Sequence, residues 1–403
     1  MTLDRFRWVY CQLDNLRRCM PSSIRKSLNE LPITLDETYE RTLQGIPKQK
    51  WQHAHRLFQC LVAAIRPLRV EELAEIFTIE FGSNVANSLV EDWRPEDPEE
   101  AVLSACSTLI SIIDDDEGSK IVQFSHFSVK EFLTSDRLQT TDVENVRQYY
   151  ISLEPAHTLL AQACITVLLQ LDENVDRRRL ERFTLAFYAA KHLVDHAKFQ
   201  NVESQIQDAM EHLFNPMKPH FRAWVWIYNT APWSLSSKLD KCSSPPPPDF
   251  TSLYYAAFCG FSGLAKRLII AHAEDVNAKC CHGCTPLHGA RDVDVARVLL
   301  DHGADINAQK DGNISLLHLA SIHGPPKLVQ FLLEHEAAVD ARDSYESSSL
   351  YFASQYGRLE VVRLLLDHGA DPNIEGLSGT PLQVATMHGH RDVARLLQDH
   401  GAH

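Results

Sequence analysis

The segment Thr285-Pro286-Leu287-His288-Gly289-Ala290 recurs in altered form along the C-terminal part of the chain. Each copy has a hydroxyl residue first, a leucine third and an alanine sixth, and the copies begin at Thr251, Thr285, Ser315, Ser348 and Thr380. A second string, Asp301-His302-Gly303-Ala304-Asp305-Ile306-Asn307, recurs as 334–340, 367–373 and the truncated 399–402. A repeat of about 33 residues with these features predicts a stacked helical array over residues 249–403.

The residues of one copy indicate how it folds. Thr285 is a suitable N-cap, and Pro286 fits the first helical position, where its missing N–H costs no hydrogen bond. Paired leucines such as Leu299-Leu300 fill the layer between copies, and Gly303 supplies a left-handed helix end. A unit of this size cannot bury its own apolar face, so its stability depends on stacking.

The strings Thr285-Pro286-Leu287-His288 and Thr380-Pro381-Leu382, with the His-Gly-Ala strings, resemble the ankyrin repeat. The resemblance implies protein partners that bind on the concave side of a five-repeat array. We expect contacts with such a partner at groove and hairpin-tip positions, namely Phe258, Lys310, Ile322, His323, Arg342, Tyr345, Gln355, Tyr356, Leu377, Met387 and His388. The alternative for each of them is an ordinary surface residue.

Departures from the repeat pattern predict local irregularities. Thr285 to Ser315 spans only 30 residues, so the turn between the two helices of the second repeat should be distorted. Glu336 stands where a glycine is expected, which predicts a strained or replaced helix end. The last repeat has no capping repeat after it, which predicts partial exposure of Val393, Leu396 and Leu397.

The charge balance argues against two classes of partner. The net charge is −14, and residues 249–403 contribute 12 Lys and Arg against 19 Asp and Glu, a net of −7. An evenly acidic chain is a poor match for nucleic acid or for an anionic membrane. The ten cysteines lie mostly among apolar neighbours, as expected for reduced thiols in a cytoplasmic protein. We expect no targeting peptide at the N-terminus, because Asp4, Arg5 and Arg7 interrupt any hydrophobic core, and no run approaches the roughly 18 uncharged residues of a spanning helix.

A small domain precedes the array. Helical patterns at 54–65, 70–77 and 99–108 are followed by β-rich runs at 109–113 and 120–125 around an acidic turn. Helices followed by a hairpin are typical of a winged helix. DNA-binding winged helices usually carry a basic wing, whereas this turn contains consecutive acids, so we do not expect DNA binding.

The strings Phe124-Ser125-His126-Phe127-Ser128 and Tyr188-Ala189-Ala190-Lys191-His192 resemble fungal NACHT-type signalling NTPases that carry ankyrin repeats. In that family the equivalent of His126 approaches the phosphates of bound ADP. No G-x-x-x-x-G-K-[ST] motif occurs here, so the rest of that site is missing. We therefore predict that His126 is structural, at a strand end with its imidazole bonded to a backbone carbonyl. A vestigial phosphate contact is the alternative, and no cofactor is expected.

The resemblance sets the predicted domain boundaries. Residues 1–50 form a helical segment resembling the end of a NACHT module, 51–148 a winged-helix-like domain, 149–233 a helical bridging domain, 234–248 a Pro/Ser-rich linker, and 249–403 five ankyrin repeats. The predicted fold is mainly α, with a helical and winged-helix-like N-terminal half followed by an α-solenoid.

Candidate chemistry is confined to one cluster, Cys280-Cys281-His282-Gly283-Cys284. A structural zinc site needs four converging ligands, and no second pair is evident, so the cluster is interpreted as an exposed turn with reactive thiols. The histidines of the second recurring string lie at successive helix ends and do not converge on one site, namely His302, His335, His368 and His400. No nucleophile elbow or zinc-protease motif occurs, so we predict neither a metal nor a catalytic residue, and a protein that is not an enzyme.

Two functions remain from different classes. The first is a non-enzymatic scaffold or adaptor of a NACHT-type signalling or innate-immunity-like protein, which binds partner proteins through the array. The alternative is the C-terminal regulatory or sensor fragment of a nucleotide-dependent STAND NTPase switch. The sequence carries no signal for the partner's identity, the biological process or the oligomeric state.

Overall fold

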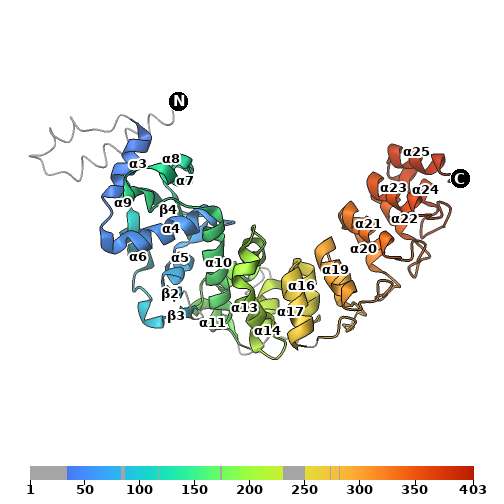
Figure 1. Ribbon diagram of the computed structural model, residues 1–403, viewed down its shortest axis with the longest axis horizontal. Coiled ribbons are helices and arrows are strands. Elements are labelled where there is room, and N and C mark those ends of the chain that lie inside the picture. The colour runs from blue at the N-terminus through green and yellow to red at the C-terminus, as the bar shows by residue number, and fades with distance from the viewer. Residues whose placement is uncertain are drawn as a thin grey trace, which may run out of the picture. The chain divides into compact units, whose positions relative to one another are not determined.

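The computed structural model describes residues 34–82, 87–116, 118–172, 175–229, 250–272, 274–280 and 282–403. The predicted helices before residue 32, the linker 234–248 and Cys281 lie outside these residues. The chain divides into two compact units, Met1–Ala209 with Ala223–Pro245, and Met210–Arg222 with Pro246–His403. The fold is mainly helical, with a winged helix before the repeat array, as the sequence predicts (Figure 1).

The first part of unit one is the winged-helix region. Its elements are α3 (Leu35–Gln44), η2 (Lys48–Lys50), α4 (Trp51–Ala63), β1 (Leu68–Arg69), α5 (Val70–Phe77), β2 (Ile79–Glu80), β3 (Ser88–Leu89), η3 (Glu91–Trp93), α6 (Pro98–Cys106), β4 (Ile110–Asp114), β5 (Lys120–Phe124), α7 (Phe127–Leu133), α8 (Asp136–Thr140) and α9 (Glu144–Arg147). Thr34 and Glu37 form the capping box that starts α3. Leu57, Phe58 and Leu73 lie in the core between these elements.

The wing is an antiparallel hairpin of β4 and β5, in which Ile112 pairs with Val122 and Asp114 with Lys120. A third strand, β1, joins the other edge of β5 through Leu68 and Arg69, so the strand order is β1-β5-β4. A separate short pair forms between β2 and β3. The β4–β5 hairpin is predictable because both strands are rich in β-branched residues. The strands β1, β2 and β3 have only two residues each, which is too short to show an alternation of apolar and polar side chains.

A helical part follows, and it belongs to unit one except for residues 210–222. Its elements are α10 (Leu153–Leu168), α11 (Arg177–Arg182), α12 (Ala186–Ala197), α13 (Val202–Phe214) and α14 (Pro219–Asn229). Residues 183–185 leave the helical conformation between α11 and α12. There the Leu185 N–H donates to the Glu75 carboxylate of α5 (2.6 Å), which fixes the start of α12 against the winged-helix region.

A buried polar network lies under α12. The Tyr188 hydroxyl bonds Nε2 of His196 (2.8 Å), and Nδ1 of His196 lies 2.9 Å from Nδ1 of His157 in α10. The Ile65 N–H, in the loop after α4, donates to the same tyrosine oxygen (3.2 Å). Three chain segments therefore meet at one set of hydrogen bonds, and Tyr188 and His196 are fully buried.

Unit two is the repeat array, in which each repeat is a helix pair. The pairs are α16 (Ser252–Cys259) with α17 (Ser262–His272), α18 (Pro286–Gly289) with α19 (Val293–Asp301), α20 (Leu316–His323) with α21 (Pro326–Glu334), α22 (Ser349–Gln355) with α23 (Leu359–Asp367), and α24 (Pro381–Met387) with α25 (Arg391–Asp399). The first helices contact one another in sequence, and so do the second helices, which gives two layers (Figure 1).

Residues 210–222, which precede the predicted start of the array at residue 249, pack against the first repeat. The Glu211 carboxylate accepts from Arg267 (2.5 Å) and lies 3.2 Å from Nε2 of His272, both in α17. The Phe214 ring meets Phe261 edge-on, with 6.3 Å between the ring centroids. Residues 210–222 therefore belong with the array and bury the outer side of its first repeat.

The second repeat is distorted where its shorter length predicts it. Its first helix, α18, has four residues, and Ala290 leaves the helical region with φ −61° and ψ 126°. Gly289 permits this packing, because a Cβ there would lie 2.8 Å from the Tyr254 carbonyl oxygen. A bulkier residue at this position would push α18 away from α16.

Glu336 ends α21 in the left-handed conformation, with φ 65°. Gly303, Gly369 and Gly401 have φ between 84° and 89° at the equivalent helix ends, and an added Cβ would touch nothing within 4 Å at any of them. The predicted strain at Glu336 is therefore confined to its own backbone.

Replacing Glu336 by glycine should stabilise the third repeat by about 0.5–1 kcal/mol, because glycine has no Cβ penalty at positive φ. Amide hydrogen exchange in α21 measures this as slower exchange from locally opened states. Gly369→Ala is the matched control and should accelerate exchange in α23. Faster exchange in the Glu336→Gly variant would show that the Glu336 side chain contributes more than its backbone costs.

The expectation of an uncovered last repeat is wrong for two of its three residues. Val393 and Leu397 are buried, at 2% and 0% exposure, and only Leu396 is half-exposed. The reason is that α25 turns its apolar stripe inward onto α23 and α24 and presents its charged residues outward.

Candidate functional site

The first helices and the hairpin tips that join successive repeats form one surface of the array, which we call the groove face. Each described tip is closed by a backbone bridge, between Lys310 and Ile314, between Arg342 and Ser348, and between Gly376 and Gly379. Two buried histidines fix the tips. Nε2 of His288 lies 3.1 Å from the Ile314 carbonyl oxygen, and Nε2 of His318 lies 3.0 Å from that of Ala341.

The two histidines also cap their own helices. Nδ1 of His288 accepts from the Thr285 N–H (3.1 Å), and Nδ1 of His318 accepts from the Ser315 N–H (3.2 Å). Burial lowers the pKa of both imidazoles, so they are neutral at pH 7 and the single proton of each lies on Nε2. These histidines are structural and hold the groove face in shape.

The predicted partner-binding residues all lie at the surface, but they differ in how far their side chains are exposed to solvent. Four of the predicted residues are half-exposed, namely Phe258, Lys310, Ile322 and Gln355. Seven are exposed, namely His323, Arg342, Tyr345, Tyr356, Leu377, Met387 and His388. The exposed fractions of the large apolar side chains are 62% for Tyr345, 51% for Tyr356, 68% for Leu377 and 67% for Met387.

Several of these residues meet on the first helices of the last three repeats. The His323 ring meets the Tyr356 ring edge-on, with 5.8 Å between centroids. The Gln355 carbonyl oxygen lies 3.1 Å from Nε2 of His390, whose ring stacks on His388 at 6.3 Å. His390 was not predicted, because it lies at the turn before α25, where no other repeat has a histidine.

The hairpin tips carry the other exposed apolar side chains. The buried Asp343 carboxylate accepts from the N–H groups of Tyr345 (2.9 Å) and Ser347 (2.8 Å). The Ser347 hydroxyl in turn accepts from the Leu377 N–H on the next tip (3.2 Å). Tyr345 and Leu377 are therefore held out to solvent on two turns that are hydrogen-bonded to each other.

An aromatic ladder lies at the other end of the groove face. The rings of Phe250 and Tyr254 stack at 4.2 Å, and those of Tyr254 and Phe258 at 6.4 Å. The Arg291 guanidinium lies 3.9 Å from the centroid of the Phe258 ring, within cation–π distance. Of these residues only Phe258 was predicted. Arg291 follows the distorted α18, so its position depends on how the second repeat packs.

His126 lies in the winged-helix region, and its predicted bonding is wrong. It does not bond a backbone carbonyl at a strand end. It is the N-cap of α7, with Nδ1 2.6 Å from the Ser128 hydroxyl and accepting from the Ser128 N–H (3.3 Å). The Ser128 hydroxyl also bonds the Tyr39 hydroxyl of α3 (2.9 Å). The imidazole therefore caps α7, and Ser128 connects α7 to α3.

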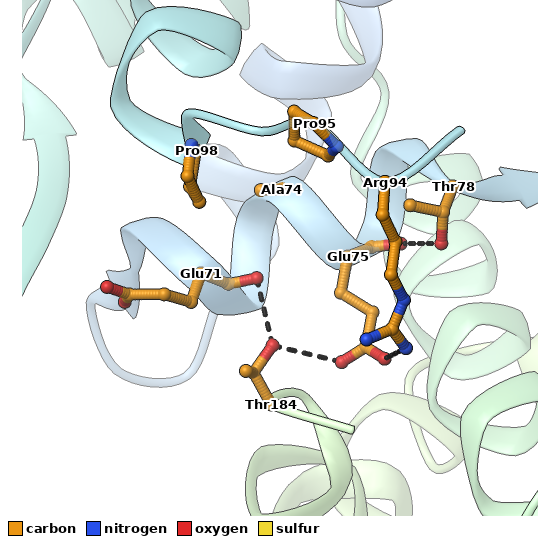
Figure 2. A pocket seen from close by; sticks show the side chains of 8 residues that line it. All are labelled: Glu71, Ala74, Glu75, Thr78, Arg94, Pro95, Pro98 and Thr184. Atoms are coloured by element: carbon orange, nitrogen blue, oxygen red, sulfur yellow. Dashed lines mark hydrogen bonds and ion pairs between the residues drawn. The ribbon is translucent and has the colours of Figure 1, made fainter. Parts of the chain in front are cut away.

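A small cavity of about 140 Å³ lies beside α5 and is lined by Glu71, Ala74, Glu75, Thr78, Arg94, Pro95, Pro98 and Thr184 (Figure 2). The Glu75 carboxylate accepts from Arg94 (3.0 Å), Thr184 (3.0 Å) and the Leu185 N–H (2.6 Å). Burial raises the pKa of Glu75, and these donors oppose the shift. With its oxygens engaged, this carboxylate joins parts of unit one and is not poised for acid–base chemistry.

The cysteine cluster is only partly an exposed turn. Cys284 is buried, and burial raises the pKa of its thiol to about 11, so the predicted reactive thiol is wrong at this position. Within the described ranges no group of three or more His, Cys, Asp or Glu side chains is arranged to hold a metal ion. None of the described helices is both long and apolar enough to cross a membrane.

Comparisons with known proteins match two parts of the chain. The family model of ankyrin repeats in three copies matches residues 233–310 and 309–376. The family model of the winged helix domain of GPI inositol-deacylase matches residues 39–143. The chain therefore contains ankyrin repeats preceded by a winged helix of this type, and ankyrin repeats imply interaction with other proteins.

Two curated proteins are similar to this chain. Azaphilone pigments biosynthesis cluster protein L of Monascus ruber is 28% identical over 295 residues, 69% of this chain. The chain spans 61% of the length of that protein. Alpha-latrocrustotoxin-Lt1a of Latrodectus tredecimguttatus is 38% identical over 71 residues, which cover 17% of this chain and 5% of the toxin.

Proposed function

We propose that the chain is a non-enzymatic scaffold or adaptor that binds a partner protein through the groove face of its ankyrin repeats. The observation that carries this proposal is the exposure of Tyr345, Tyr356, Leu377 and Met387, which are all more than half exposed on adjoining first helices and tips. These side chains contribute little to the core, and exposed tyrosines are typical of the residues that dominate binding energy at interfaces.

The proposal also covers enzymatic activity, the class of partner and the location of the protein. We propose no enzymatic activity, because the titratable groups described above are engaged in capping and packing. The net charge of −14 supports a protein partner over nucleic acid or an anionic membrane. The six cysteines among the described residues are free and five of them are buried, which supports a cytoplasmic location.

Replacing Tyr345 and Tyr356 together by alanine is expected to abolish capture of the partner from lysate of the source cells. Loss of two interface aromatics costs about 2 kcal/mol or more of binding energy each where they are hot spots. The melting temperature should stay unchanged, because both side chains are exposed. Ile270→Ala is the matched control, since Ile270 is 65% exposed on the second helix α17, away from the groove face. Capture that survives the double substitution would count against this surface.

A second candidate function is favoured by the match of residues 39–143 to the winged helix domain of GPI inositol-deacylase. In this alternative the chain is the regulatory or sensor part of a NACHT-type nucleotide-dependent switch, whose P-loop half is encoded upstream or supplied by another chain. Calorimetry with ATP and ADP on the present chain should then detect no heat, because no P-loop is present. An in-frame P-loop upstream of Met1 would support this alternative, and micromolar binding to the isolated chain would contradict the assignment of the missing site.

A further inference from the structure

We propose that the groove face of the second to fifth repeats takes a basic apolar segment, in which large apolar side chains stand beside a Lys or Arg that pairs with Glu375. The inference rests on the proposed function, since it names the chemistry of the partner at the same surface. It also assigns the segment a direction along the array, because the two ends of the groove face carry opposite charge.

The first helices of the last three repeats form the floor of the groove face, and this floor carries no charged side chains. The helical segments 316–323, 349–356 and 381–388 contain no Asp, Glu, Lys or Arg. Their exposed side chains are all uncharged, namely His323, Tyr356, Gln383, Thr386, Met387 and His388. A charge placed against them would lose water and meet no opposite charge, so an uncharged segment rich in apolar or aromatic side chains fits this floor best.

The tips above this floor are acidic. Residues 342–346 and 375–379 contain one cation, Arg342, against Asp343, Glu346 and Glu375, a net of −2. Arg342 is bound to Glu346 (3.2 Å), and Asp343 is buried and accepts from its own turn. Glu375 is exposed, and no salt bridge to it occurs in the part of the chain that the structure describes.

Glu375 is therefore the charge that a partner can neutralise. It stands two residues before Leu377, which is 68% exposed on the same tip. A Lys or Arg beside an apolar side chain matches this pair, because its stem can lie on Leu377 while its cation reaches the carboxylate. The net charge of −7 over residues 249–403 attracts the same kind of segment from a distance.

The opposite end of the groove face carries the opposite sign. Arg291 is exposed, and it is the single charged residue of the segments 250–259, 286–291, 316–323, 349–356 and 381–388. Its guanidinium lies over the Phe258 ring, and a guanidinium can pair with a carboxylate through two N–H groups. A bound segment whose cation lies at Glu375 and whose acidic residue lies near Arg291 pairs opposite charges at both ends. The same segment bound in the reverse direction would place like charges together at both ends.

Selection of random phage-displayed peptides on the purified full chain tests the proposal. Peptides that bind should be enriched in aromatic or aliphatic residues next to Lys or Arg. A selected peptide, synthesised with a fluorophore, should bind at least about fivefold more weakly to Glu375→Lys at low salt, with the difference shrinking at high salt. Arg291→Glu should weaken peptides that carry an acid at the other end. A second selection on Glu375→Lys should yield acidic peptides in place of basic ones.

The outcomes separate this inference from the function on which it rests. Peptides that lose binding in the Tyr345→Ala/Tyr356→Ala variant, yet show no basic excess and no response to Glu375→Lys, would overturn the inference and leave the groove as the binding surface. Failure to select any peptide sensitive to the double substitution would overturn both. Equal melting temperatures of all variants show that the losses are not due to unfolding.

Discussion

Replacing Tyr188 by phenylalanine is expected to lower the local free energy of unfolding of α12 by about 1–3 kcal/mol. The hydroxyl is the partner of two buried groups, Nε2 of His196 (2.8 Å) and the Ile65 N–H (3.2 Å). Without the hydroxyl, both groups lose a hydrogen-bond partner in a site that excludes water, since the side chains of Tyr188 and His196 are fully buried. The loss should be larger than for removal of a hydroxyl that water can replace.

Amide hydrogen exchange of α10 and α12 measures the effect, because it reports opening of these helices separately from the array. Tyr345→Phe is the matched control and should change nothing, since its side chain is 62% exposed on a tip. Exchange in α12 that is unchanged by Tyr188→Phe would mean that water enters the site and replaces the hydroxyl.

Acidification is expected to destabilise unit one through the same network. Burial lowers the pKa of His196 to about 3, with His157 and His192 adding repulsion, and burial together with Lys130 lowers the pKa of His157. Only one proton fits between the two Nδ1 atoms, which lie 2.9 Å apart. The tyrosine can donate to Nε2 of His196 while the Nδ1–H of His196 donates to His157, and this arrangement satisfies every partner with both rings neutral.

The direction of the effect follows from proton linkage. The folded pKa of His196 lies below its unfolded value of about 6.5, so the unfolded chain binds more protons between these two values. The contribution is fully present above pH 6.5 and is lost as pH falls toward 3, on the order of 5 kcal/mol for the full shift. His288 and His318 act in the same direction in unit two, since burial lowers the pKa of each.

Hydrogen exchange of α12, followed at several pH values and corrected for intrinsic rates, measures this loss. The His196→Gln variant should be less stable at pH 7 but should lose less further stability on acidification. His282→Gln is the control, because the His282 side chain is 65% exposed. A wild-type pH dependence that survives in His196→Gln would assign the acid sensitivity to other groups.

The array was predictable because its contacts are close in sequence. The N-caps at Thr285 and Thr380, the left-handed Glu336 and the shortened α18 all follow from residues within one repeat or its neighbour. In the winged-helix region the same holds for α5 and for the β4–β5 hairpin. Local capping, turn and periodicity signals were sufficient for these elements.

The long-range features were not predictable. The buried polar network joins three separate stretches of sequence, with Tyr188 and His196 in α12, His157 in α10 and Ile65 after α4, and none has a pattern that pairs it with the others. The break at residues 183–185 depends on Glu75, about a hundred positions earlier. The N-cap role of His126 has a different cause, because its partner Ser128 is only two residues away but histidine is not among the usual N-cap residues. The bond from Ser128 to Tyr39 is long-range.

The sequence by itself determined the number of repeats and which side chains each repeat directs toward the groove face, because a fixed offset from the N-cap sets a residue's direction on a short helix. Only the tertiary structure decided which of those side chains stand together. Stacking brings His323 onto Tyr356 and His390 onto Gln355, and it buries Val393 and Leu397. These outcomes depend on packing between helices, which repeat spacing alone does not encode.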